Sequence, residues 1–200
     1  MRADAGTENV YAVGIQWFLR SCCEDSFSGD KSFLYGKSVS NQRIEAWWSF
    51  LKKSNASWWI DFFKDMRDEG IFSDHDPIHL ECLRFCFMPL IQGELNKVAT
   101  HWNLHKIRPL HNVESPSGRP HVLYYVPAWT NTMDYLTEVD RYNIDVIAGV
   151  CCDRGSPTYC LEESRELIDI ILQEQQLQVP STALEARNLF VDLVYHFDNS

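Results

Sequence analysis

One long helical pattern constrains this chain more than any other feature of its sequence. Asp76 and Pro77 are the residue types preferred at a helix N-cap and at the first helical position. From there an apolar-rich run continues to about Trp102, which predicts one long helix. Pro89 lies inside this run, and because proline lacks the N–H of the helical ladder it predicts a kink there.

Apolar residues recur at helical spacing elsewhere, whereas strand patterns are short and few. The patterns predict further helices over 8–22, from Ser40 or Asn41 to Leu51, over 58–70, over 162–178 and over 182–197, the last with Ser181 as its cap. Short strands are predicted at 32–35 and, within a loop-like segment over 109–127, at 122–126. The sequence therefore predicts a largely helical chain.

The charged residues divide the chain into two parts. Residues 1–128 carry 14 Lys and Arg against 15 Asp and Glu, a net charge of −1. Residues 129–200 carry the remaining 4 basic and 13 acidic residues, a net of −9 out of −10. A DNA-binding surface is usually basic, so the first part can hold a local basic face, whereas the acidic tail would repel phosphate. The candidate boundary lies near Pro127–Thr130.

Composition and cysteine usage limit the class of protein. Hydrophobic residues make up 45% of the chain and aromatic residues 13%, enough for a packed core. No segment approaches the roughly 18 to 20 continuous apolar residues of a membrane helix, and no apolar stretch of a signal peptide follows Met1. The seven cysteines include the adjacent pairs Cys22–Cys23 and Cys151–Cys152, which do not suit a disulfide framework. We therefore expect free thiols in a reducing compartment, with neither membrane association nor secretion.

Two strings of residues carry candidate chemistry. In the first, from Asp4 to Asn9 (DAGTEN), an Asp followed by Gly and a helical pattern can present a carboxylate at the tip of a strand, with Thr7 capping the helix. In the second, Glu45 falls in the first turn of an amphipathic helix, and Ser49 and Lys52 follow on its side. That layout suits a metal ion and then a phosphate backbone. An ordinary turn and a solvated polar helix face are the alternative interpretations.

Together the two strings resemble the catalytic core of retroviral-integrase-like transposases, the DDE enzymes, which have a ribonuclease-H-like fold. The resemblance rests on Asp-x-Gly-Thr-Glu-Asn and, about forty residues later, Asn-Gln-Arg-Ile-Glu-x-x-Trp-x-x-Leu-Lys. Further matches follow in order, at His101-Trp102-Asn103 with Arg108-Pro109 and at Gly118-Arg119-Pro120. The resemblance covers residues 1–127 and stops before the tail.

The resemblance implies roles for individual residues. Asp4 and Glu45 correspond to the second and third catalytic carboxylates, and both would be ligands of Mg²⁺ or Mn²⁺. Lys52 corresponds to a lysine that contacts DNA, and Arg43 and Lys53 beside it are further expected DNA contacts. Two cations about 3.5–4 Å apart activate the attacking oxygen and stabilise the leaving one, and they need three acids between them.

Here the chain departs from the family pattern. Only Met1, Arg2 and Ala3 precede Asp4, so we expect that the first carboxylate and the opening strands are missing, or that the protein is longer at its N-terminus. The expected fold is α/β, a partial ribonuclease-H-like integrase catalytic core at 1–127 that is mostly helical, followed by an acidic helical tail at 128–200. The tail, a second copy in a homo-oligomer or another protein would cover the truncated sheet.

Two functions follow from this interpretation. The first is a transposon-derived, integrase-core-like protein that binds DNA, is located in the nucleus or otherwise in the cytoplasm, and does not carry out strand transfer alone. The second is a non-catalytic, domesticated remnant that serves as a protein or nucleic-acid interaction module.

Two other patterns are interpreted as structural. Cys82-x3-Cys86 followed by His101-x3-His105 has a spacing loosely like that of a zinc finger, but the cysteines lie in an apolar run, so buried thiols are expected. The tryptophans at 47, 48, 58 and 59 could stack on bases, yet their helical spacing predicts a packed core.

Overall fold

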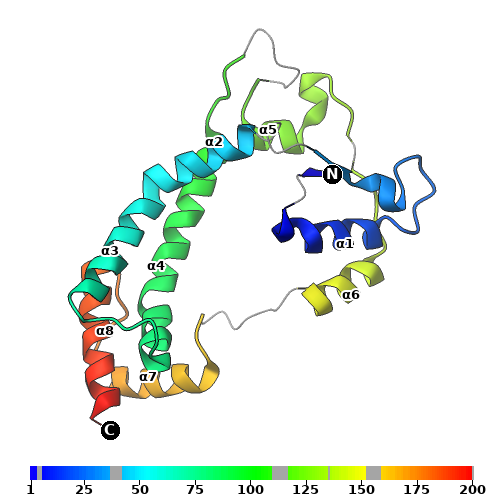
Figure 1. Cartoon of the computed structure of the whole chain (residues 1–200). Coiled ribbons are helices and arrows are strands. Elements are labelled where there is room, and N and C mark those ends of the chain that lie inside the picture. Colours follow the sequence, from blue (N-terminus) through cyan, green and yellow to red (C-terminus); the bar gives the residue numbers. More distant parts are fainter. Residues whose placement is uncertain (4–5, 37–41, 110–116, 135, 152–158, 200) are drawn as a thin grey trace. The chain divides into compact units, whose positions relative to one another are not determined.

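The computed structural model describes residues 1–3, 6–36, 42–109, 117–134, 136–151 and 159–199 (Figure 1). Within these ranges helices dominate, and the only sheet is a pair of two-residue strands. Contacts divide the chain into two compact units, Met1–Ser54 with Leu136–Gly155 and Asn55–Tyr135 with Ser156–Ser200. The boundary near residue 127 rests on charge and resemblance and stays a prediction.

The first unit is built on a short parallel strand pair. Its elements are β1 (Arg2–Ala3), η1 (Thr7–Asn9), α1 (Val10–Leu19), η2 (Gly29–Ser32), β2 (Leu34–Tyr35), α2 (Gln42–Leu51) and α6 (Arg141–Cys151). Arg2 pairs with Leu34 and Ala3 with Tyr35, so the predicted strand at 32–35 is confirmed in its second half. Parallel strands need a crossover connection, and here α1 with its flanking 3-10 turns provides it. The helix packs against η2 and α6 and buries Val13.

A nearly buried arginine closes the loop after α1. Arg20 is only 9% exposed and pairs through Nη2 with Oδ2 of Asp25. The other oxygen of Asp25 accepts a hydrogen bond from the backbone N–H of Phe27, which is the main reason why the pKa of Asp25 lies below its usual value. The carbonyl of Arg20 also accepts from Gly29 N–H at 2.9 Å, so this loop is tied to the start of η2.

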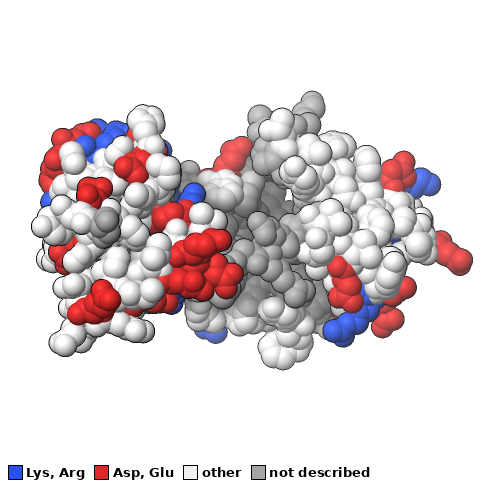
Figure 2. All heavy atoms as spheres, turned by 90° about the horizontal axis from the view of Figure 1, so that it is seen from below, with Lys and Arg blue, Asp and Glu red and all other residues white. Residues whose placement is uncertain are grey.

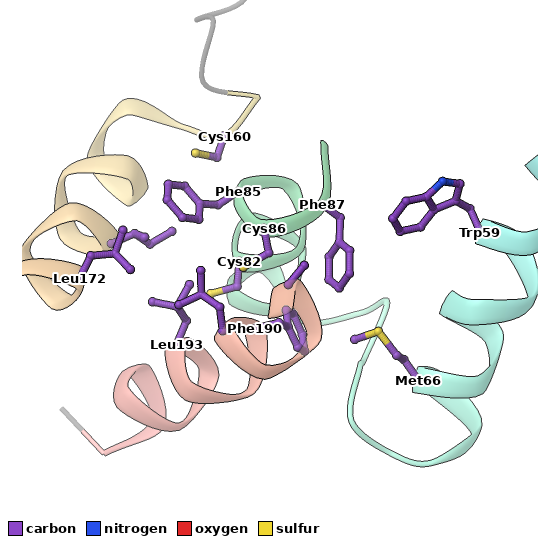
Figure 3. Close-up of a cluster of buried hydrophobic side chains, with 13 residues drawn as sticks. Trp59, Met66, Cys82, Phe85, Cys86, Phe87, Cys160, Leu172, Phe190 and Leu193 are labelled. Carbon is purple, nitrogen blue, oxygen red and sulfur yellow. The ribbon is translucent and has the colours of Figure 1, made fainter. Parts of the chain in front are cut away.

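The second unit is a helical cluster with one hydrophobic core. Its elements are α3 (Ser57–Asp68), α4 (Pro77–Leu104), α5 (Pro120–Tyr125), η5 (Pro127–Thr130), α7 (Glu162–Glu174) and α8 (Ala183–Asp198). The long helix α4 packs along α8, and α7 also packs on α8. Phe87 and Phe190 are fully buried between these helices, with ring centroids 6.4 Å apart (Figure 3). Burial of large aromatic side chains is the main stabilising contribution that the core makes.

The long helix begins where the sequence predicts it. Asp76 Oδ1 accepts hydrogen bonds from the N–H groups of Ile78 and His79, at 2.8 and 3.4 Å, and Pro77 is the first helical residue. The helix continues through Pro89 to Leu104, slightly beyond the predicted end. The kink at Pro89 stays a prediction. The helices predicted over 8–22 and 58–70 are also present, as α1 and α3.

The segment around Val122 differs from its sequence prediction. The predicted strand at 122–126 is wrong, because residues 120–125 form α5. Pro120 is the first helical residue and Arg119 before it is extended, an arrangement that begins a helix. The β-branched side chains of this segment favour a strand only weakly, so the proline prevails.

Two further features at helix starts were not predicted. Helix α6 has a clear start signal, since Asp140 Oδ1 accepts from Tyr142 N–H at 3.0 Å. The cap of α8 is Thr182 and not Ser181. Thr182 and Glu185 form a reciprocal capping box, and Ser181 donates its hydroxyl to Glu185 instead.

Thr7 and α7 also depart from the prediction in detail. Thr7 is the first residue of η1 and not its cap, a position that Gly6 takes without a side-chain hydrogen bond. Helix α7 ends at Glu174, four residues before the predicted end. Gln176 has a φ of +54°, a left-handed conformation that cannot continue a right-handed helix.

The neighbouring tryptophans do not behave alike. Trp59 is 7% exposed and belongs to the core, whereas Trp58 is 54% and Trp48 is 60% exposed. The prediction of a packed core is therefore right for Trp59 and wrong for Trp48 and Trp58; Trp47 is half-buried. Consecutive helical residues point about 100° apart, so one of two neighbours can face the core while the other faces solvent.

Replacing Phe190 with Ala should lower the free energy of unfolding by about 3–5 kcal/mol, because it leaves a cavity in the core. Val191→Ala is the matched control on the same helix, since Val191 is 44% exposed, and it should cost less than about 1 kcal/mol. Urea unfolding of the two variants measures the difference. Equal losses would contradict the placement of Phe190 inside the core.

The cysteines should differ sharply in reactivity. Burial raises the pKa of the Cys82 thiol to about 12 and that of Cys86 still further, whereas Cys22 is exposed. Since the thiolate is the reacting form, iodoacetamide at pH 8 should modify Cys22 and leave Cys82 and Cys86 untouched until urea unfolds the protein. Peptide mass spectrometry assigns each site. Equal labelling of Cys82 and Cys22 in the folded protein would contradict the buried cluster.

Candidate nucleic-acid and metal site

Helix α2 places Glu45 in an accessible position. Glu45 lies in the first turn of the helix and is exposed, as is Ser49 one turn later. Trp47 and Phe50 are half-buried and in edge contact, with ring centroids 6.4 Å apart. The helix is therefore amphipathic, and a carboxylate near its N-terminus is stabilised by the helix dipole. This confirms the predicted location of Glu45 but leaves its role untested.

The exposed lysines lie where the helix changes its winding. Residues Lys52–Ala56 form a π-helical turn, η4, which directly follows α2 and leads into α3. Lys52 and Lys53 begin this turn, and both are exposed. Single π-turns inside helices are rare and are found often at functional sites. The turn thus presents two adjacent cations to solvent, about two helical turns beyond Glu45.

A carboxylate from α4 holds the end of the π-turn. Glu94 Oε2 accepts a hydrogen bond from Asn55 Nδ2 at 2.9 Å and another from Trp59 Nε1 at 2.8 Å. Two bonds to one ionised acceptor connect α3 and its preceding turn to α4. Sequence reasoning missed Glu94. Its signal was an acidic residue inside the long apolar pattern, together with two donors spaced by four residues.

Two of the predicted site residues are not placed by the structure. Asp4 lies outside the described residues, and β1 ends at Ala3, immediately before it. Arg43 belongs to α2, but its side chain is not described. The pairing of Asp4 with Glu45 around a metal ion therefore stays a prediction, as does a DNA contact by Arg43.

No complete metal centre is found in the described part of the chain. Nowhere in it do three His, Cys, Asp or Glu side chains gather so that they could hold a metal ion. The zinc-like spacing of cysteines and histidines has the expected structural explanation. Cys82 and Cys86 are 0% and 1% exposed in the core, and His105 contacts the carbonyl oxygen of Trp102 through Nδ1.

Comparison with known families shows which family the chain belongs to. A family model described as an integrase core domain matches residues 1–125, well over half of the chain. The chain belongs to the integrase core family. The match begins with β1 and ends at Tyr125, the last residue of α5, so it includes α2 with Glu45. No curated protein and no solved structure gave a match.

Membership of the integrase core family indicates which general ligands to expect. Integrase-like domains bind DNA, and integrase core domains generally use divalent metal ions. The mostly helical structure is compatible with a partial integrase core. None of the helices that the structure describes is long and apolar enough to span a membrane.

If Glu45 is a metal ligand, Glu45→Gln should abolish Mn²⁺ binding measured by calorimetry, because an amide is a poor ligand for a hard divalent cation compared with a carboxylate. Asp4→Asn should do the same. Glu24→Gln is the control, since Glu24 is an exposed acid in the same unit and should leave binding unchanged. Unchanged affinity in Glu45→Gln would overturn the assignment.

Proposed function

We propose that this integrase core protein is transposon-derived and takes part in DNA integration, with a ribonuclease-H-like core and a DDE-type site. The family match over residues 1–125 carries the proposal, together with exposed Glu45 on α2 and the lysines that follow it. The parallel pair β1–β2, joined across α1, supports an α/β core because such crossovers characterise α/β folds.

The residues fit a hard divalent cation. Glu45 offers a solvent-accessible carboxylate, and Asp4 is a second carboxylate directly after strand β1. Oxygen ligands of this kind are those that Mg²⁺ and Mn²⁺ prefer. When bound, such ions would supply Lewis acidity for an in-line phosphoryl displacement.

The protein's own contribution is to bind and orient DNA. Lys52 and Lys53 lie next to each other on the π-turn, and both reach solvent. Their charges can neutralise adjacent backbone phosphates, and Arg43, two residues before Glu45 in α2, is proposed as a further phosphate contact. Phosphate contacts set the position of the duplex without reading its sequence. We therefore assign these residues a positioning role on DNA.

Asp4 and Glu45 are two of the three carboxylates that a two-metal displacement uses. We therefore propose that these 200 residues do not carry out strand transfer by themselves, and that a third carboxylate from outside them would be needed. The nucleus is the expected location, since chromosomal DNA is the proposed partner.

A second function is favoured by the acidic C-terminal residues. Residues 129–200 have a net charge of −9. Figure 2 shows Asp and Glu side chains on one face of the molecule. On α7, Glu163, Glu166, Leu167 and Ile170 are exposed at the spacing of one helical face. Acidic and apolar side chains on one face suit a protein partner better than DNA. The alternative is thus a domesticated, non-catalytic interaction module.

The double substitution Lys52→Gln/Lys53→Gln should weaken duplex DNA binding and reduce the slope of log K against log salt by about 2, since each lost phosphate contact accounts for about 0.9. Fluorescence anisotropy over a range of salt concentrations measures both quantities. Lys31→Gln, an exposed lysine of the same unit, is the control. An unchanged affinity and slope in the double variant would refute the DNA contact at the π-turn.

A further inference from the structure

The segment after the middle of α4 has a charge opposite to that of the whole chain. Residues 95–130 contain four Lys and Arg but only one Asp or Glu, within a chain of net charge −10. All four cations are exposed, and three of them, Lys106, Arg108 and Arg119, flank one backbone bridge. Two of them belong to sequence motifs to which the Glu45 site assigns no role.

One backbone bridge brings these cations together. Ile107 and Gly118 pair antiparallel, with the Ile107 N–H 2.8 Å from Gly118 O and the Gly118 N–H 3.2 Å from Ile107 O. This register sets Lys106 opposite Arg119. Lys106 and Arg119 are thus neighbours across the bridge, and Arg108 directly follows Ile107.

The bridge between Ile107 and Gly118 is supported by its neighbours in α4 and α5. Gly118 has a φ of +146°, and a Cβ added there would lie 3.2 Å from Cδ2 of Leu123 in α5. Ile107 is half-buried. His121 Nδ1 lies 2.6 Å from Asn103 O, so α5 is also joined to the end of α4. The bridge that carries Lys106 and Arg119 is therefore held by α4 and α5.

Exposed aromatic rings follow Arg119 in the next two elements. Tyr124 is 76% exposed, and Tyr125 and Trp129 are each 77% exposed. The tyrosines belong to α5 and Trp129 to η5, and α5 packs against both α4 and η5. These three large rings, within six residues of one another, are exposed to solvent and contribute little to the core. Flat rings beside cations suit unpaired bases, because every base offers a π-face for stacking and a phosphate for ion pairing.

We propose that the basic aromatic surface, defined as Lys106, Arg108, Arg119, Tyr124, Tyr125 and Trp129, binds single-stranded nucleic acid. The cations contact the phosphates, and the rings stack on unpaired bases. This surface shares no residue with the proposed Asp4–Glu45–Lys52 site and needs no metal ion. It therefore goes beyond the proposed function, and it can be tested in the presence of EDTA.

The charge contribution is tested by anisotropy with a labelled oligothymidine of about twenty nucleotides. Arg108→Gln/Arg119→Gln should weaken binding at least tenfold and lower the salt slope by about 1.4, since each phosphate contact on a single strand accounts for about 0.7. Lys64→Gln, an exposed lysine on α3 of the same unit, should bind as the unaltered protein does. Equal binding by the arginine variant and the control would overturn the proposal.

The stacking contribution needs its own variants. Tyr125→Ala and Trp129→Ala should each weaken binding to oligothymidine by about fivefold or more, while binding to an abasic oligomer of the same length stays the same. Tyr11→Ala is matched in exposure at 77% and should have no effect. Coincident thermal unfolding curves establish that the variants are folded. Loss of abasic binding as well, or no loss on oligothymidine, would contradict stacking.

Competition separates this proposal from the proposed function. Single-stranded DNA and RNA of equal length should both displace the labelled strand better than duplex DNA does. Preference for the duplex would overturn the proposal. Lys52→Gln/Lys53→Gln should retain single-strand binding at this surface; if that variant loses it while the arginine variant keeps it, the π-turn binds and the basic aromatic surface does not.

Discussion

Between Cys82 and Phe87, four side chains of α4 have 6% or less of their surface exposed. A single helix cannot exclude water from itself, so these residues must be covered by α3, α7 and α8. Trp59 and Met66 approach from one side, and Phe190 and Leu193 from another (Figure 3). The positions of the remaining parts of this unit follow from that enclosure, because α5 and the bridge at Ile107 are attached to the same long helix.

The core joins residues inside the integrase core match to helices that lie beyond it. The integrase core match ends at residue 125, yet α7 and α8 lie beyond it and supply Ile168, Leu172, Phe190 and Leu193 to the core. The hydrophobic face of α4 therefore lies inside the matched region, whereas much of its cover lies outside. The acidic residues of α7 and α8 occupy the outer side of the same helices that stabilise the unit.

Local signals in the sequence predicted local structure well. The start of α4 at Asp76-Pro77 and the exposed position of Glu45 on α2 depend on neighbouring residues, so the sequence alone was enough. The π-turn and its hydrogen bonds to Glu94 were not predictable, because they depend on residues that are about forty positions apart. The bridge at Gly118 was not predicted either, because it joins residues eleven positions apart and uses a positive φ at Gly118 that other residues rarely adopt.

Helix α4 spans 28 residues, which at 1.5 Å per residue is a rod of roughly 40 Å. Most of its buried residues precede Pro89, and its far end leads to the basic segment that begins at Lys106. The two ends of α4 therefore tolerate substitution differently. A change of side-chain volume near Phe87 disturbs the packing of the core, whereas exposed residues beyond Leu104, such as Lys106 and Arg108, can change charge at little cost in the free energy of unfolding.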